Sequence, residues 1–251
     1  MNKCHYLLRA MVFASMLGTF GVAQAAVTVN VAGDANPWLA GMPSGSTASG
    51  DIDPQPPVEV TGLNLVAGGY LTFTGVTGAT SYAAGCPDSE CFSADGDVTG
   101  VTDYLGGSLG FINRAWAGYP GGENGISDVT VPLSSLVGVF LDGSQPDLSL
   151  APGAPDFRLI GLDFDALSPE LKQVFFIGDG LTSTNAVQQF FIPVGATRLY
   201  LGTMDGYGWT GNNGSIVVTV DAVPEPETYA LLLVGLGLVG AVTRRRKQAL
   251  A

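Results

Sequence analysis

Histidine is almost absent from this chain of 251 residues, which contains only His5. His5 falls in an N-terminal segment where Lys3 and Arg9 precede an apolar stretch and Ala23-Gln24-Ala25 forms a small-x-small cleavage site. This pattern is typical of a signal peptide over residues 1–25, so we expect the Sec translocon and signal peptidase to leave a mature protein that begins near Ala26. The mature protein then has no histidine, which excludes Ser-His-Asp catalysis, Cys-His catalysis and any histidine-ligated metal.

Positive charge is also scarce. Between residues 26 and 222 there are four basic residues against twenty acidic ones, which gives a net charge near −16. This balance excludes nucleic acid as a partner, because its phosphates attract positively charged surfaces. It is compatible with a hard cation such as calcium, which prefers carboxylate and carbonyl oxygens. For most of these carboxylates, a surface that keeps an exported protein soluble is a sufficient explanation.

Cysteine is rare, with three in the chain, and Cys4 would leave with the signal peptide. Cys86 and Cys91 remain in the exported part. An even pair in an oxidising compartment predicts a disulfide that closes a small loop, and the alternative is a free pair of thiols. Two thiolates are too few for a structural zinc site, which usually needs four ligands.

Helical periodicity is missing outside the two terminal segments. Instead, short β-branched or aromatic runs alternate with turn residues, at 27–31, 58–65, 70–75, 137–141, 174–177, 187–192, 198–201 and 215–220. Short strands of this kind predict one all-β domain over residues 26–222, a β-sandwich of the jelly-roll or galactose-binding-like type. Pro169 favours one helical turn at 168–172, and we expect long loops at 36–57 and 86–128.

The last segment, 223–251, has a different composition. Pro224 and Pro226 favour an extended linker, because proline cannot donate ladder hydrogen bonds. An apolar run at 229–243 follows, and then the basic cluster 244–247. The run covers only roughly 22 Å as a helix, so we expect a single short transmembrane helix. The clustered positive charges predict that its C-terminal end stays in the cytoplasm and that the bulk of the chain lies outside.

The order of these features resembles the PEP-CTERM sorting signal of Gram-negative bacteria. The resemblance is carried by Pro224, Glu225 and Pro226, the short apolar span, and Arg244, Arg245 and Arg246. It implies processing by an exosortase, a membrane protease-transpeptidase that removes the tail. It also implies an inner-membrane intermediate, followed by release to the cell surface or an extracellular matrix. Proteins with this signal are associated with exopolysaccharide and biofilm.

The segment 202–215 is the richest in potential ligands. Asp205, Asn212 and Asn213 supply one carboxylate and two amide oxygens, and the glycines between them allow backbone carbonyls to point inward. This ligand set suits calcium. The same residues also suit a plain hairpin turn, since Asn-Gly and Gly-Asn are favoured in turns whatever they bind.

The stretch from Asp205 to Ser215 resembles the calcium loop of the PA-IL-like bacterial lectins, which are β-sandwich proteins that bind galactose through calcium. Ser81-Tyr82, after a predicted strand, resembles a second element of that family. The resemblance implies backbone ligands from Tyr82 and from Trp209 or Thr210, with side-chain ligands from Asp205, Asn212 and Asn213. The loop is one residue shorter than in the family, so the roles of the two asparagines stay open. The sugar-contacting histidine of the family has no equivalent, and galactose specificity is therefore not implied.

In a sugar complex, Asp205 would accept a hydrogen bond from a hydroxyl, and an aromatic face would stack on the ring. Tyr207 and Trp209 are the nearest aromatic candidates and Trp116 is a more distant one, although each is also a candidate for core packing. Asp163 and Asp165 could imitate a glycosidase pair, but solvated or turn-capping roles explain them better.

The sequence therefore predicts a non-enzymatic, calcium-dependent carbohydrate-binding module whose partner is an extracellular polysaccharide or a galactoside. The alternative is a structural matrix protein in which calcium only rigidifies a loop.

Overall fold

The computed structural model describes residues 26–85, 91–100, 105–106, 109–224, 233–237 and 239. The contacts divide the chain into two units, and the unit Gln24–Thr228 holds all of the named strands. Several predicted features lie outside the described residues: the signal peptide at 1–25, Cys86, Glu225, Pro226, and the arginines 244–246. Cys91 is disulfide-bonded. Because Cys86 is not among the described residues, its pairing with Cys91 stays a prediction.

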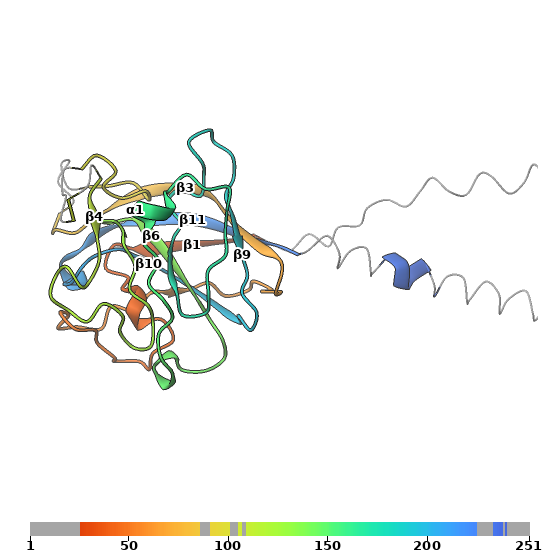
Figure 1. Ribbon diagram of the computed structural model, residues 1–251, viewed down its shortest axis with the longest axis horizontal. Helices are drawn as coiled ribbons and strands as arrows, with labels where there is room; N and C mark the ends of the chain where they lie inside the picture. Colours follow the sequence, from red (N-terminus) through yellow and green to blue (C-terminus); the bar gives the residue numbers. More distant parts are fainter. Residues whose placement is uncertain are drawn as a thin grey trace, which may run out of the picture. The chain divides into compact units, whose positions relative to one another are not determined.

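The regular secondary structure of the unit Gln24–Thr228 is mainly β-strand, which confirms the all-β prediction (Figure 1). One five-stranded sheet has the order β1-β11-β3-β9-β7, with bounds Val27–Ala32, Asn213–Val223, Tyr70–Ser81, Gln189–Phe191 and Ala166–Leu167. A four-stranded sheet has the order β2-β10-β6-β8, with bounds Val58–Glu59, Arg198–Thr203, Leu136–Leu141 and Val174–Phe176. A two-stranded sheet pairs β4, Phe111–Ile112, with β5, Val131–Pro132.

Helical structure in this unit is short. The helix α1 covers Phe157–Ile160, and three 3₁₀ turns cover Pro37–Leu39, Pro146–Leu148 and Trp209–Gly211 (η1, η2 and η3). The helical turn predicted at 168–172 is wrong. Lys172 has a left-handed backbone with φ of 65°, and its N–H donates to the carbonyl of Phe140, so the chain turns there instead of continuing a helix.

Each of the eight predicted strand regions contains an observed strand, whereas β4, β5 and β7 were not predicted. The prediction of β11 succeeded because buried and exposed residues alternate along this strand. Ile216, Val218 and Val220 are fully buried, and the intervening Val217 is 37% exposed. The buried residues form a single cluster that draws on both large sheets. Phe175 of β8 and Phe190 of β9 meet within it, with their ring centroids 5.8 Å apart.

Strand β11 organises the domain, because it pairs with β1 on one side and β3 on the other, both antiparallel. At its beginning, Asn213 lies opposite Ser81, the last residue of β3. At its end, Val223 lies opposite Tyr70, the first residue of β3. The strand therefore has two distinct ends, which we call the loop end, at Asn213, and the exit end, at Val223.

Among the described residues, none of the helices is both long enough and apolar enough to cross a bilayer. The predicted membrane span at 229–243 lies largely outside those residues. Within it, the described positions 233–237 and 239 are helical.

Candidate functional site

A pocket of about 250 Å³ lies at the loop end of β11. Its lining residues come from four separate parts of the chain: Tyr82, Ile112, Trp116, Leu133, Asp205, Tyr207 and Gly208. Three residues from the sequence-predicted site, Tyr82, Asp205 and Tyr207, thus line one cavity, together with the more distant candidate Trp116. We call this cavity the Asp205 pocket.

The strand register explains why these segments meet. Tyr82 follows Ser81, which pairs with Asn213, so the end of β3 lies beside the start of β11. The segment between β10 and β11 turns through η3, where the N–H of Asn212 donates to the carbonyl of Trp209 at 2.9 Å. Gly208 makes this turn with a left-handed φ of 75°. The loop therefore folds back against the end of β3.

Asp205 is the buried acid of the pocket, with 6% of its surface exposed. Its Oδ1 accepts hydrogen bonds from the backbone N–H groups of Gly206, at 2.6 Å, and Tyr207, at 3.4 Å. Burial raises the pKa of Asp205 to about 7, and the charge of Asp51 adds to the increase. Hydrogen bonds from the two backbone groups and from the Asn212 side chain lower this pKa but do not offset the burial. The ionised form of Asp205 would therefore need further stabilisation, from a bound cation or from an additional hydrogen-bond donor.

Asn212 and Asn213 differ in whether their side-chain oxygen already accepts a hydrogen bond. The Oδ1 atom of Asn212 is buried and has no hydrogen-bond partner among the described residues, while its side chain bonds the carboxylate of Asp205. The Oδ1 atom of Asn213 accepts from the N–H of Gly214 at 2.6 Å, and this residue is exposed. Asn212 is therefore the better candidate ligand of the two.

Trp209 does not have the exposed position that a sugar-stacking role requires. Its side chain is fully buried, its ring contacts Trp38 edge-to-face at 5.4 Å, and its indole N–H donates to the carbonyl of Thr203 at 2.9 Å. The prediction that this ring stacks on a ligand must be corrected, because both its faces and its polar edge lie in the core. Its backbone carbonyl remains a possible ligand.

Exposed aromatic groups are nevertheless present at the Asp205 pocket. Tyr207 is 51% exposed and Trp116 is 42% exposed. Tyr207 stacks against Tyr119, with ring centroids 5.7 Å apart and planes at 27°. These rings offer apolar faces next to a buried carboxylate, a combination that suits a ligand with C–H faces and hydroxyl groups.

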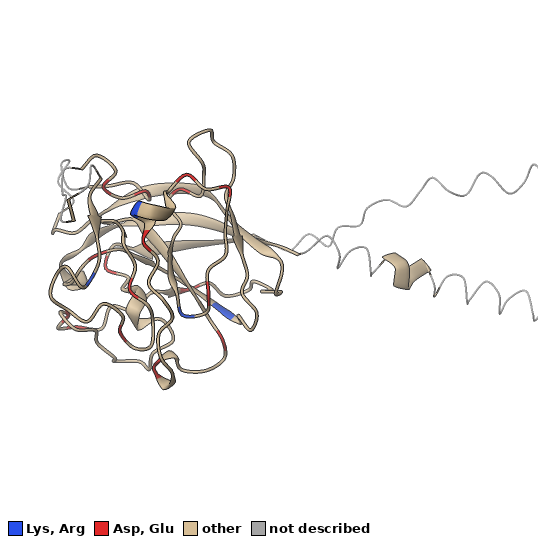
Figure 2. Ribbon diagram, in the orientation of Figure 1, with Lys and Arg blue, Asp and Glu red and all other residues tan. Residues whose placement is uncertain are grey.

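A buried arginine, Arg114, packs against the ring of Trp209 in the η3 turn and was not predicted from the sequence. It is one of the few cations of the domain (Figure 2), and its side chain is fully buried. Its guanidinium carbon lies 5.0 Å from the centre of the Trp38 ring and 5.9 Å from that of Trp209. The group forms an ion pair with Glu123 and donates to the carbonyl of Ser49 at 2.9 Å. It therefore joins loops that are far apart in the sequence.

Asp51 is a second unpredicted residue, and it stands beside the η3 turn. Its Oδ2 accepts from the amide of Asn36 at 2.9 Å, and its Oδ1 accepts from the N–H of Thr210 at 3.4 Å. Burial raises its pKa, against the opposing effect of these donors. Asp51 occurs in a Gly- and Ser-rich loop without any motif spacing, so only the folded structure reveals its contact with Thr210.

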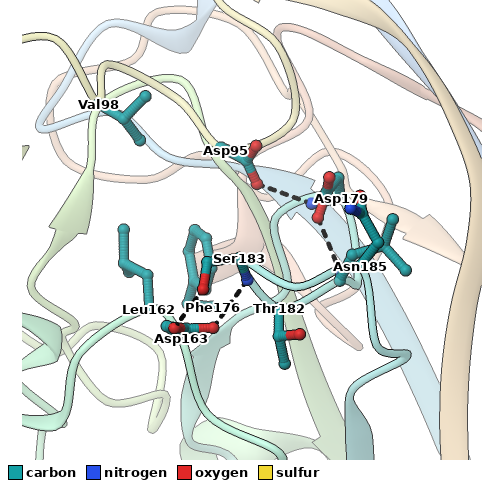
Figure 3. A pocket seen from close by; sticks show the side chains of 10 residues that line it. Asp95, Val98, Leu162, Asp163, Phe176, Asp179, Thr182, Ser183 and Asn185 are labelled. Atoms are coloured by element: carbon teal, nitrogen blue, oxygen red, sulfur yellow. Dashed lines mark hydrogen bonds between the residues drawn. The ribbon is translucent and has the colours of Figure 1, made fainter.

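A second pocket, of about 360 Å³, lies elsewhere on the domain and contains three acids, Asp95, Asp163 and Asp179 (Figure 3). Asp95 accepts from the N–H of Asp179 at 2.9 Å. Asp163 accepts from both the N–H and the hydroxyl of Ser183, and it is exposed, as is Asp165. These contacts agree with the solvated, loop-capping roles expected from the sequence.

The described residues contain no group of three or more histidine, cysteine, aspartate or glutamate side chains that could hold a metal ion. A cation at the Asp205 pocket would thus depend on amide and carbonyl oxygens in addition to its carboxylate.

Comparison with protein families matches residues 222–247 to the PEP-CTERM protein-sorting motif. The motif marks the chain as an exported protein that an exosortase processes, with a membrane-anchored intermediate on the way to the surface. No curated protein and no solved structure matches the chain.

Proposed function

We propose that the exported domain is a calcium-dependent carbohydrate-binding module of a surface or biofilm-matrix protein, with no catalytic role. In this proposal the two large sheets pack as a sandwich, and an extracellular polysaccharide or a galactoside binds at the Asp205 pocket. The observation that carries the proposal is the pocket itself, which gathers Tyr82, Trp116, Asp205 and Tyr207 around one cavity.

The polar groups of the pocket fit a calcium ion. Asp205 supplies a buried carboxylate, and Asn212 supplies a buried oxygen that lacks a partner among the described residues. The carbonyls of Tyr82 and of Trp209 or Thr210 would complete an all-oxygen ligand set of the kind calcium prefers. Calcium would also keep Asp205 ionised, because a nearby cation lowers the pKa of a carboxyl group. Asn213 is a weaker ligand candidate, since its oxygen is already hydrogen-bonded.

The exposed aromatic groups fit the apolar face of a sugar ring. Trp116 and Tyr207 both line the pocket, and each exposes about half of its surface. Sugar hydroxyls would bind the calcium ion and Asp205, while an indole or phenol face covers the C–H groups. Trp116 takes over the stacking role that the buried Trp209 cannot perform.

Titration calorimetry on the unit Gln24–Thr228 tests the proposal, first with calcium and then with a panel of galactosides and exopolysaccharide sugars. Asp205→Asn should abolish calcium binding, because one carboxylate supplies most of the formal charge of the site. Trp116→Ala should leave calcium binding intact and weaken sugar binding by about tenfold, equivalent to roughly 1.4 kcal/mol. Asp163→Asn, in the other pocket, is the matched control and should change neither.

A structural matrix protein is the second candidate function. It is favoured by the network in which Asp51 ties Asn36 to Thr210, because calcium beside this network would rigidify the loop end without any sugar. Calcium binding that raises the unfolding temperature, with no response to any sugar in the panel, would favour this candidate. Absence of both responses would reject both candidates.

A further inference from the structure

The sorting motif begins inside the last strand of the folded domain. The motif covers residues 222–247, whereas β11 extends to Val223. Ala222 pairs with Leu71 and Val223 pairs with Tyr70, so the first two residues of the motif belong to the sheet. Ala222 is only 7% exposed. Pro224, the first proline of the recognition element, therefore follows a paired strand without any spacer.

The backbone is tightly packed at this point. A β-carbon added to Gly69 would lie 2.7 Å from the carbonyl oxygen of Val223 and 3.3 Å from the Cα of Pro224. Gly69 is itself hydrogen-bonded to the residue that follows β9, since its carbonyl accepts from the N–H of Ile192 at 2.9 Å. The chain immediately before the prolines is thus in close contact with the domain.

The exit end of β11 is nevertheless held from one side only. Strand β1 begins at Val27, which pairs with Val220. Residues 221–223 therefore pair with β3 alone, whereas Ser215 to Val220 have a strand on each side. Strand ends with one neighbour can open locally at a free energy far below that of global unfolding.

We propose that opening of the Ala222–Val223 end of β11 controls the rate at which the exosortase processes this protein. An enzyme that binds an extended segment by strand addition forms hydrogen bonds with backbone groups that must be free of other partners. In the closed sheet, the groups before Pro224 are already paired with β3. When opening is fast relative to cleavage, processing follows the population of the open form, so the folded domain limits the reaction. The proposal is independent of what the Asp205 pocket binds.

A spacer variant of the full chain tests the proposal in an exosortase-bearing host. Insertion of Gly-Ser-Gly-Ser-Ala-Val after Val223 keeps Ala-Val directly before Pro224 but moves the motif away from the sheet. Pulse-chase labelling would follow conversion of the tail-bearing precursor to the processed form. We expect processing at least about fivefold faster, since losing one backbone hydrogen bond is worth about 1 kcal/mol. The same six residues added after Ala251 are the control for length and should have no effect.

A second pair of variants tests the same point without changing the motif. Gly69→Ala should speed processing by forcing the exit end of β11 away from β3. Gly33→Ala is the matched control, because its added β-carbon would lie 2.2 Å from the carbonyl oxygen of Asn213, at the loop end. It should leave the processing rate unchanged. Processing of the spacer variant at the wild-type rate or more slowly would overturn the proposal, and so would processing of the Gly69→Ala chain that is no faster than that of the Gly33→Ala chain.

Discussion

The two ends of strand β11 are built in different ways. At the exit end, Val223 pairs with the first residue of β3, and the contacts are regular ladder contacts between strands. At the loop end, the segment before Asn213 carries the buried Asp205, and it contacts Asp51 through Thr210 and Arg114 through Trp209. One end is thus made of regular backbone pairing and the other of irregular backbone with buried polar groups.

This difference shows where the domain gives up stability. A buried carboxylate with a raised pKa and an amide oxygen without a partner both cost free energy in the absence of a ligand. Such costs are concentrated at functional sites, where binding can offset them. Among the described residues, the exit end has no buried side-chain polar atom without a partner, and the sorting motif begins there.

The largest effect is expected from Arg114→Met, which removes the buried cation at the loop end. We expect the unfolding free energy to fall by about 3 kcal/mol, because the ion pair with Glu123 and the contacts with the two tryptophans are lost. Urea unfolding of the unit Gln24–Thr228 would measure the change.

The matched control for this variant is Arg158→Met. Arg158 forms an ion pair with Asp156 on the surface, where 38% of its side chain is exposed. Exposed pairs contribute less than about 1 kcal/mol, so this variant should stay close to the wild type. Equal effects of the two substitutions would contradict the claim that the loop end depends on a buried charge.

The next effect concerns the dependence of stability on pH. The pKa of Asp205 is about 7 in the folded protein and near 3.8 in the unfolded chain. Between these values the folded state holds a proton that the unfolded state has lost, so stability falls as pH rises. The contribution of this one group approaches about 1.4 kcal/mol per pH unit.

Asp205→Asn removes this contribution while keeping a similar shape. In the presence of a calcium chelator, the stability of this variant relative to the wild type should therefore increase from pH 4 to pH 7, as measured by urea unfolding. The raised pKa values of Asp95 and Asp128 affect both proteins and largely cancel in the difference, whereas Asp51 interacts electrostatically with Asp205 and contributes through that interaction. A constant difference over this range would show that Asp205 does not titrate there. Added calcium should reduce the decline in the wild type only.

Sequence patterns predicted the regular exit end of β11 better than the irregular loop end. The alternation in Ile216-Val217-Val218 identifies β11 and its buried face. The strand β7 was missed because Ala166–Leu167 is too short to show a period, and it forms only through its parallel pairing with β9. The sorting motif was recognised because it is contiguous in the sequence.

The candidate site was only partly predictable, because some of its residues are contiguous in the sequence and others are not. Asp205 and Tyr207 were found because they lie in one Gly-rich stretch. Arg114 and Asp51 come from distant loops, and nothing in their local sequence indicates that they approach Trp209 or Thr210. The burial of Trp209 was equally hidden, since an aromatic residue in a loop can face either solvent or the core.

The smallest effect is expected from Thr28→Val, near the exit end. The variant to compare with it is Thr203→Val, near the loop end. The hydroxyl of Thr28 lies 2.9 Å from that of Thr219 on an exposed face, so its loss should change stability by less than about 0.5 kcal/mol. Thr203 is 1% exposed, and its hydroxyl donates to the carbonyl of Gly33 at 2.6 Å. Thr203→Val leaves that carbonyl without this donor in a buried position and should cost about 1–3 kcal/mol in urea unfolding. A Thr28 variant as unstable as the Thr203 variant would mean that burial does not determine what these polar contacts contribute.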